Sequence, residues 1–428
     1  SNVYDKFLVE IKNKDTRIII DIGIPLNVAE IDSDDILPKV EGLYSSTFPQ
    51  KKVNAIFISH SHLDHYGLLG NISKEIPIFI GEASKDLIEI SNLFMKDKWS
   101  INNYQILKAE NPILIGSIKI TPFLIDHSAF DSYCFFIEAD GKKILYTGDF
   151  RNHGRKGKLT DKITGRLSKH IDAVIIEGTN INRIQEKINT EENIENEIIE
   201  KVKNKIGINL IMLGSQNIDR IVSIYKATSK MKKILVVDIY TANILATLSK
   251  YAKIPYPSSN FKNIKVIFTQ KLCRKLELEG KKDNILKFSK FKITKEEIET
   301  NKDNIMMIVK NSMLEEIGNI KGIENGTPKW RDGISKKPFQ MSYNYVTKRP
   351  YNGLNAFQLS FSELGQKDPR WMTFNNAKEL NLKVKPNEKG TKVFAFRLYD
   401  TKEKKKKLPT LLKKFSLTSF VFISFLCF

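Results

Sequence analysis

Four side chains of the kinds that bind metals stand within six positions, directly after a short apolar run at residues 56–58. They are His60, His62, Asp64 and His65, and the chain has only six histidines in all. Imidazole nitrogens and carboxylate oxygens are ligands that divalent transition metals favour in proteins. Residues two apart on an extended backbone point to the same side, and a turn in the loop brings His65 round as a further donor. The pattern predicts a metal-binding loop at the end of a buried strand, rather than an ordinary solvated loop.

Two later apolar segments each end in one more potential ligand. His127 follows a strand expected at residues 113–123, and Asp149 follows a strand expected at residues 143–146. The dipeptide Asp140-Gly141 is typical of a hairpin turn leading into the second of these strands. A donor at the tip of a strand is presented at the edge of a sheet, so we expect both side chains to reach a site shared with the histidine loop.

The pattern of expected secondary structure changes near Thr190. Before it, short apolar strands dominate, including one expected to be buried at residues 172–176. After it, amphipathic helical patterns alternate with apolar strands, which is typical of a parallel α/β arrangement. The alternation fades in a lysine-rich region at residues 288–303, before a strand at 305–309. The expected helices are 191–205, 218–227 and 241–252, and the expected strands between them are 208–213 and 233–237.

The order of these motifs resembles the metallo-β-lactamase family. The matching features are the histidine loop, the isolated His127 and the Thr-Gly-Asp turn that ends in Asp149. Residues 146–151 (YTGDFR) and 177–180 (EGTN) resemble the ribonuclease J-like, β-CASP branch, whose members act on nucleic acids. The resemblance implies an α/β fold. The implied domains are a metallo-β-lactamase αββα sandwich over residues 1–185 and a β-CASP-like α/β inset over residues 186–318.

The same resemblance assigns roles to the ligand set. A first zinc ion would lie among three imidazoles, and a second beside a carboxylate and an imidazole, with one further carboxylate bridging the two. Two cations ~3.5–4 Å apart polarise a phosphoryl oxygen and activate water, which suits hydrolysis of a phosphodiester. Of these residues, Asp64, Asp149 and His127 would also take part in catalysis. The implied ligands are His60, His62 and His127 for the first ion, Asp64 and His65 for the second, and Asp149 as the bridge.

Residues around the ligand set both extend and limit this resemblance. Asp21 stands where the family uses a carboxylate to orient the histidine loop, and Glu177 matches the first motif of the inset. The family closes its second metal site with a histidine beyond the inset, whereas no histidine follows His170 here. His153 and His170 stand too early to replace it. We therefore expect one complete zinc site and an incomplete second site, with Mn²⁺ as an alternative metal.

The positive charge of the chain is concentrated towards its C-terminal end. Residues 321–428 hold 22 Lys and Arg against 8 Asp and Glu, a net +14 of the whole chain's +20. A surplus of this size favours a polyanionic partner, with a solubilising surface as the plainer alternative. The motifs TPKW (327–330), YNGLN (351–355) and DPRWMTF (368–374) resemble the N-terminal, single-stranded-DNA-binding domain of ArdC-type antirestriction proteins. This resemblance implies a small basic α+β module over residues 324–410.

Aromatic and basic residues alternate through this module. Aromatic rings stack on unpaired bases, while Lys and Arg contact phosphates. Trp371 and Phe374 stand inside an apolar stretch, where a place in the core is the alternative interpretation. The residues expected to contact single-stranded DNA or RNA are Lys348, Arg349, Tyr351, Asn355, Arg370, Trp371, Lys385 and Lys389.

Cysteine usage and the apolar end of the chain bear on its surroundings. Cys134, Cys273 and Cys427 are far apart, which indicates a reducing compartment and favours a cytoplasmic protein. An apolar tail is expected at residues 411–428, shorter than the ~20 residues that span a bilayer, so no stable membrane span is expected. A homodimer is left open.

Three functions fit these observations. The first is a zinc-dependent phosphodiesterase or nuclease acting on RNA or DNA, fused to a single-stranded-DNA-binding module. The second is a catalytically impaired metal domain on an antirestriction-type DNA-binding protein of a mobile element, which the missing histidine keeps open. The third is a hydrolase of a small ester or thioester, because this fold hosts many substrates.

Overall fold

The computed structural model describes most of the first three quarters of the chain and four strands beyond it. The chain divides into two compact units, Ser1–Ile320 and Lys321–Phe428. The described residues are 2–4, 8–24, 37–44, 52–95, 101–167, 171–178, 189–318 and 320, with the strands at 343–344, 370–373, 391–398 and 415–424.

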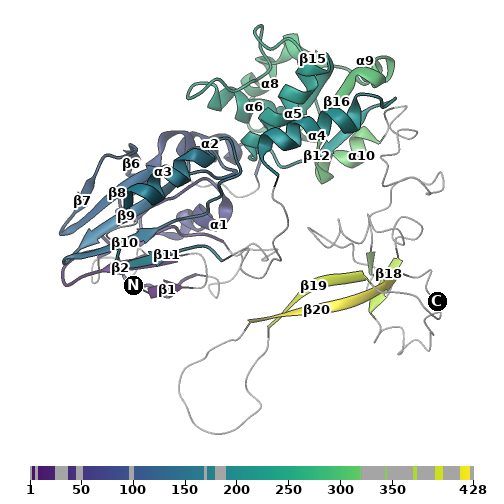
Figure 1. Ribbon diagram of the computed structural model, residues 1–428. Helices are drawn as coiled ribbons and strands as arrows, with labels where there is room; N and C mark the ends of the chain where they lie inside the picture. The colour runs from purple at the N-terminus through teal and green to yellow at the C-terminus, as the bar shows by residue number, and fades with distance from the viewer. Residues whose placement is uncertain are drawn as a thin grey trace. The chain divides into compact units, whose positions relative to one another are not determined.

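A six-stranded sheet opens the first unit (Figure 1). In sheet order its strands are β1 (Asn2–Tyr4), β2 (Leu8–Lys12), β3 (Arg17–Ile20), β4 (Ala55–Phe57), β5 (Ile78–Gly81) and β6 (Tyr104–Leu107). The strands β1 to β3 are antiparallel neighbours, whereas β3 to β6 run parallel. Ile19 and Ile56 face one apolar core, while Ile18, Ile20 and Phe57 face another. Both faces of the sheet are therefore covered, which explains why β3 and β4 are apolar nearly throughout.

A second, five-stranded sheet packs against the first. Its strands are β7 (Ile113–Ile115), β8 (Ile118–Leu124), β9 (Tyr133–Ala139), β10 (Lys142–Tyr146) and β11 (Ala173–Ile175), in the order β11-β10-β9-β8-β7. The core between the sheets is partly aromatic: the ring of Phe57 stacks on Phe79 at 4.7 Å and meets the edge of Phe135 at 5.7 Å. The antiparallel pair β9 and β10 confirms the predicted hairpin over Asp140-Gly141.

Helices cover the outer faces of both sheets (Figure 1). On the first sheet, α2 (Glu82–Asn92) buries Ile88 in the cluster that contains Ile56. On the second sheet, α3 (Gly157–Leu167) buries Ile163 against Phe123 and Cys134. The order helix, sheet, sheet, helix is the predicted αββα sandwich.

Two expectations for the second sheet were wrong. The single strand expected at residues 113–123 is two strands, β7 and β8, because the chain reverses at residues 116–117 and pairs with itself. The strand expected to be buried at 172–176 is largely exposed, with Val174 at 51% and Ile176 at 58%. Among the described strands β11 pairs only with β10, so it is the edge of the sheet. Apolar composition alone does not reveal such an edge position.

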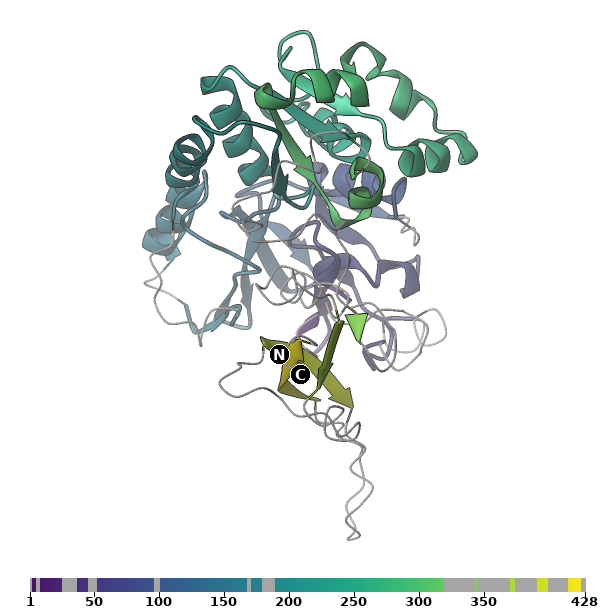
Figure 2. The ribbon, with the colours of Figure 1, turned by 90° about the vertical axis from the view of Figure 1, so that its right-hand side faces the viewer.

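The remainder of the first unit is a parallel α/β inset (Figures 1 and 2). Its five strands run parallel, and every residue of β16, which pairs with a strand on each side, is buried. Helices flank the sheet, and α5 and α6 pack against it through Ile221, Ile224 and Leu245. In sheet order the strands are β12 (Asn209–Met212), β16 (Ile305–Val309), β13 (Ile234–Asp238), β14 (Ile264–Ile267) and β15 (Lys292–Ile293). The helices are α4 (Glu191–Val202), α5 (Ile218–Lys230), α6 (Ile239–Leu248), α7 (Gln270–Leu278), α8 (Asp283–Leu286), α9 (Lys295–Thr300) and α10 (Leu314–Ile317).

The expectation that the α/β pattern fades before residue 305 was also wrong. The elements β14, α7, α8, β15 and α9 continue the alternation. Their pattern is hard to see in the sequence because the helices are short and expose most of their residues. In α7 only Leu276 is buried.

The second unit contributes a four-stranded sheet. Its strands are β17 (Tyr343–Asn344), β18 (Arg370–Thr373), β19 (Thr391–Leu398) and β20 (Phe415–Ser424), in the order β17-β18-β20-β19. The strand β20 lies in the segment for which the sequence predicts a separate apolar tail, and it pairs with both β18 and β19. Within the described residues, no helix has the length and apolar character needed to cross a membrane.

Candidate metal centre

Asp21 organises the base of the site at the end of β3. Its backbone has a positive φ of 56°, a conformation that aspartate tolerates better than most residues. Its carboxylate accepts hydrogen bonds from the backbone N–H and the hydroxyl of Ser59, both at 2.7 Å, and from the Tyr146 hydroxyl at 2.6 Å. The same carboxylate lies 2.8 Å from Nδ1 of His65. Asp21 thus joins the ends of β3, β4 and β10 and contacts the ring of one candidate ligand; its role as an orienting carboxylate stays a prediction.

The segment after Asp21 packs directly beneath the histidine loop. The N–H of Ile22 donates to the carbonyl of His65 at 2.8 Å, and the backbone passes so close that a Cβ on Gly23 would lie 1.6 Å from the Asp64 carbonyl oxygen. Only glycine fits at this approach. The short helix α1 (Leu63–Tyr66), which carries Asp64 and His65, is held in place by these contacts.

Three imidazoles converge on one point. Nδ1 of His62 lies 3.1 Å from Nε2 of His60 and 3.2 Å from Nε2 of His127. The potential ligand atoms of these three residues all lie within 4.8 Å of one another. The structure therefore brings together two histidines from the loop after β4 and one from the end of β8, separated by 65 positions in the sequence.

A second group of donors shares His60 with the first. It consists of His60, His65 and Asp149, with ligand atoms again within 4.8 Å. Asp149 reaches both groups, because Oδ1 lies 3.4 Å from Nε2 of His65 and Oδ2 lies 3.9 Å from Nε2 of His127. Asp64 lies next to the second group, with its Oδ2 3.8 Å from Nε2 of His65, but it belongs to neither group of three donors.

The protonation of the imidazoles fits a cation site. Burial and the neighbouring histidines lower the pKa of His60 well below its usual value, and burial lowers the pKa of His62 to about 4 and of His127 to about 3. All three rings are therefore neutral at pH 7, the form in which histidine binds a metal. Burial alone would lower the pKa of His65, but the carboxylates of Asp21 and Asp149 raise it to about 10. A divalent cation beside His65 would take the place of that proton.

The loop that carries Asp149 depends on its neighbours. Gly148 has a positive φ of 57°, and a Cβ there would lie 3.2 Å from the Tyr133 carbonyl oxygen. On the other side, the N–H of Phe150 donates to the Glu177 carboxylate at 2.9 Å. Glu177 therefore supports the turn after Asp149 and is not itself in either donor group.

Sequence reasoning missed several residues that shape the centre. Ser59 and Tyr146 were not singled out, although both bind the Asp21 carboxylate. Asp126 and Arg151 belong to the sequence motifs but were given no role, although each stands within two positions of a candidate ligand and their side chains form a largely buried ion pair. Their proximity to His127 and Asp149 in the sequence was the available signal. This closeness in the sequence does not by itself show what Asp126 and Arg151 do, because their partners on the inset are brought near only by the fold.

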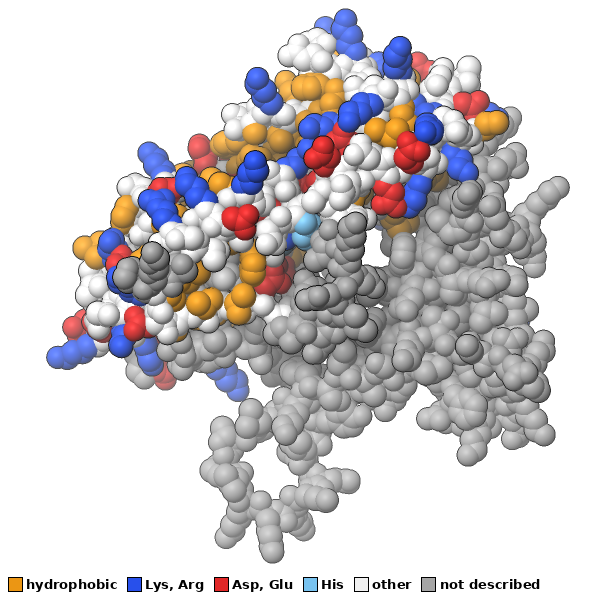
Figure 3. Space-filling model, in the orientation of Figure 1, with side chains coloured by type: hydrophobic (Ala, Val, Ile, Leu, Met, Phe, Trp, Pro, Cys, Tyr) orange, Lys and Arg blue, Asp and Glu red, His pale blue; other side chains and the backbone are white. Residues whose placement is uncertain are grey.

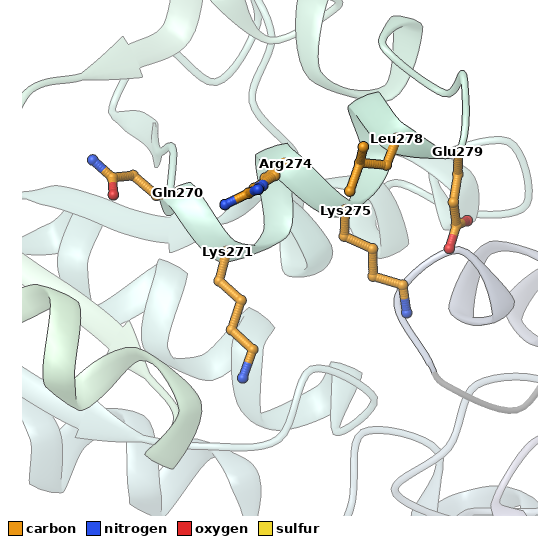
Figure 4. A pocket seen from close by; sticks show the side chains of 6 residues that line it. All are labelled: Gln270, Lys271, Arg274, Lys275, Leu278 and Glu279. Carbon is orange, nitrogen blue, oxygen red and sulfur yellow. The ribbon is translucent and has the colours of Figure 1, made fainter.

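A separate cavity lies on the inset. It measures about 550 Å³ and is lined by residues of α7 and its end, with Lys271 and Lys275 extending to the same side of the helix in Figure 4. The chemistry of its lining differs from that of the histidine cluster, since it offers cations rather than metal ligands. The lining residues are Gln270, Lys271, Arg274, Lys275, Leu278 and Glu279.

Most of the predicted nucleic-acid contacts cannot be placed. Arg370 and Trp371 lie on β18, and Arg370 is half-buried. The others, Lys348, Arg349, Tyr351, Asn355, Lys385 and Lys389, lie outside the described residues.

Comparison with known families agrees with this architecture. Residues 7–180 match the Metallo-beta-lactamase superfamily, and residues 309–418 match the N-terminal domain of anti-restriction factor ArdC. The chain thus joins a metallo-β-lactamase domain, with ribonuclease J-like relatives, to an ArdC N-terminal domain, and both resemblances drawn from the motifs are confirmed.

Individual relatives match about half of the chain. Ribonuclease J 2 of Streptococcus pyogenes serotype M3 is 26% identical over 260 residues, 58% of this chain and 45% of the relative. The RNase J-like protein of Methanocaldococcus jannaschii is 30% identical over 250 residues, 54% of each protein. Cleavage and polyadenylation specificity factor 73 of Drosophila melanogaster is 26% identical over 267 residues, 54% of this chain and 37% of the relative. This chain therefore spans about half or less of the length of these relatives.

A solved structure shares the fold. The crystal structure of a protein of unknown function from Enterococcus faecalis V583 has a TM-score of 0.50 at 17% sequence identity. The match covers 73% of this chain and 88% of that one.

Proposed function

We propose that this chain is a zinc-dependent phosphodiesterase that cuts RNA or DNA and whose second unit holds single-stranded nucleic acid. The observation that carries the proposal is the convergence of His60, His62 and His127 beside Asp149, at the ends of buried strands. The names of relatives such as ribonuclease J 2 support nucleic acid as the substrate, in place of a small ester or thioester.

The positions of the donor atoms support assigning the side chains to two different cations. The three neutral imidazoles would hold the first cation, and His65, Asp64 and Asp149 a second. A divalent cation at this position would supply charge to stabilise a developing phosphoryl oxyanion and would lower the pKa of water. Asp21 and Tyr146 hold the ring of His65 in one orientation, so its Nε2 faces the site.

Asp149 is suited to handle a proton. Burial opposes ionisation of its carboxylate, but the hydrogen bond and charge of His65 prevail and lower its pKa. An ionised oxygen between the two donor groups is placed to orient an attacking water and accept its proton. We expect Asp149→Asn to lower cleavage more than it lowers binding of the nucleic acid.

The second site is weaker than the first. Among the described residues its donor group holds two histidines, His60 and His65, and no histidine follows His170 in the sequence. We therefore expect one tightly held cation and a second that needs a higher metal concentration. Mn²⁺ is the alternative to zinc at the oxygen-rich second position.

Phosphate contacts are proposed on both units. The second unit carries a net +14, and its match to an ArdC N-terminal domain supports contact with single-stranded nucleic acid. On the first unit, cationic side chains are interspersed with acidic ones over the face shown in Figure 3. The cavity beside Lys271, Arg274 and Lys275 offers clustered cations on the first unit.

A metal-loading series tests the proposed activity. The chain of residues 1–428 is incubated with labelled single-stranded RNA and DNA at zero, one and two equivalents of Zn²⁺ or Mn²⁺. We expect cleavage that rises with loading and is lost in His62→Ala, whereas His153→Ala, outside both donor groups, keeps it. If neither polymer is cut at any loading while both are still bound, the alternative of an impaired metal domain on an antirestriction-type binding protein replaces the proposal.

A further inference from the structure

Arg151, a largely buried arginine, lies two positions after the candidate ligand Asp149. The side chain of Arg151 is 11% exposed and is surrounded by three carboxylates. Its guanidinium lies 2.6 Å from Asp219, 3.6 Å from Glu191 and 3.7 Å from Asp126. These carboxylates are 13%, 2% and 0% exposed, so each depends on the arginine for part of its charge compensation.

On one side, this cluster holds the two loops that carry metal-ligand candidates. Asp126 immediately precedes His127, and Arg151 stands two positions after Asp149. The N–H of Arg151 donates to the carbonyl of Asp126 at 2.7 Å, and the N–H of Gly154 donates to the Asp126 carboxylate at 2.8 Å. The loop after Asp149 is thereby wrapped around the residue that precedes His127.

On the other side, the cluster reaches the α/β inset. Glu191 is the first residue of α4, and Asp219 lies in the first turn of α5. Asp219 also accepts a hydrogen bond from the N–H of Arg155 at 3.1 Å, while the N–H of Glu191 donates to the carbonyl of His153 at 3.2 Å. The inset thus holds the loop at residues 151–155 from two helix ends.

We propose that Arg151 is a positioning residue of the metal centre, which locks the His127 and Asp149 loops together and anchors both to the inset. The inference rests on the proposed metal centre and concerns how its ligands are held. The ion pairs of Arg151 join it to Asp126 on one side and Asp219 on the other, rather than to a candidate ligand. Without its charge, buried carboxylates would repel one another, and the two loops would separate.

Cobalt(II) titration tests the proposal, because its visible absorption bands report the geometry of the ligands as well as the affinity. Loss of residues that support metal ligands typically costs 10–100-fold in metal affinity. We expect Arg151→Gln and Asp219→Asn each to weaken the first Co²⁺ at least about 10-fold and to change its bands. Arg151→Lys, which keeps the charge, should restore part of the affinity. In the control Arg166→Gln, which breaks the Arg166–Glu110 ion pair on α3, both readouts should match the wild type.

A second measurement applies whether or not the protein cuts nucleic acid or binds cobalt. Hydrogen exchange of the metal-free protein should speed up at residues 125–130 in Arg151→Gln and Asp219→Asn but not in Arg166→Gln. The proposal is overturned if exchange at residues 125–130 stays at the wild-type rate in both variants, or if cobalt affinity and bands are unchanged in both. A nuclease assay without product would instead count against the proposed function alone.

Discussion

Individual histidines in this site differ because of their neighbours. The pKa of His62 and of His127 is lowered by burial, whereas Asp21 and Asp149 overcome burial and raise that of His65. The sequence indicated which residues are donors, but not which of them carry a proton. That property depends on Asp21, which is 44 positions from His65. Asp64 is the one predicted metal ligand that belongs to neither donor group, and its role as a ligand stays a prediction.

The protonation pattern predicts how acid affects the metal-free protein. His62 and His127 have pKa values of about 4 and 3 in the folded chain, against roughly 6.5 when unfolded. Between those values the unfolded chain binds protons that the folded chain does not, so the free energy of unfolding falls as the pH drops from about 6.5 to 4. Urea unfolding of metal-free protein at pH 7, 6 and 5 measures this fall.

Carboxylates also contribute to acid sensitivity, so the comparison needs a variant. His127→Asn removes one titrating ring and should make the loss of stability between pH 7 and 5 shallower than in the wild type. An equal or steeper loss in the variant would contradict the assigned pKa of His127.

At the scale of elements, the sequence predicted what depends on local pattern and missed what depends on pairing. The strands β4 and β16 were predictable because each is a short, wholly apolar run. The exposure of β11 was not, because an edge position is set by which strands lie beside it. The short helices α7 to α9 were missed because they bury few side chains. The candidate ligands fall at strand ends and so were found early, while the supporting hydroxyls of Ser59 and Tyr146 were not.

The turn between β10 and Asp149 gives an element-scale prediction. Gly148→Ala should destabilise the protein by about 1–2 kcal/mol, because alanine is strained at a positive φ. The substitution should also displace Asp149 and weaken the second cation more than the first. Chemical denaturation and metal titration measure the two effects.

Gly165 provides the matched control. It lies within α3, and a Cβ there would have no atom within 4 Å. Gly165→Ala should therefore stabilise the protein by roughly 0.5–1 kcal/mol through helix propensity. If Gly148→Ala were as stable as Gly165→Ala, the turn would not require glycine.

At the scale of the whole molecule, charge is divided unequally between the two units. Residues 321–428 carry +14, although they make up only the last 108 of 428 positions. Such a surplus acts through counterion release, so binding should weaken steeply with salt. The sequence located this charge and the matching family correctly, but the spatial arrangement of Lys348, Arg349 and Tyr351 lies outside the described residues.

Paired substitutions test whether the second unit supplies the phosphate contacts. Lys348→Ala with Arg349→Ala should weaken binding of single-stranded DNA and reduce the slope of log K against log salt by about 1–2. Lys201→Ala with Lys203→Ala removes the same charge from exposed positions at the C-terminal end of α4 that pair with glutamates. This control should leave the slope unchanged, and an equal reduction in both would indicate a nonspecific effect of net charge.

The central claim, that three imidazoles from distant parts of the chain meet on one cation, is tested most directly by zinc X-ray absorption. The chain of residues 1–428 loaded with one equivalent of Zn²⁺ should show three imidazole ligands at ~2.0–2.1 Å and no sulfur among the atoms bound to zinc. The same measurement on His127→Ala should show the imidazole count fall by one. A zinc shell with sulfur, or an imidazole count that does not respond to loss of His127, would contradict the account.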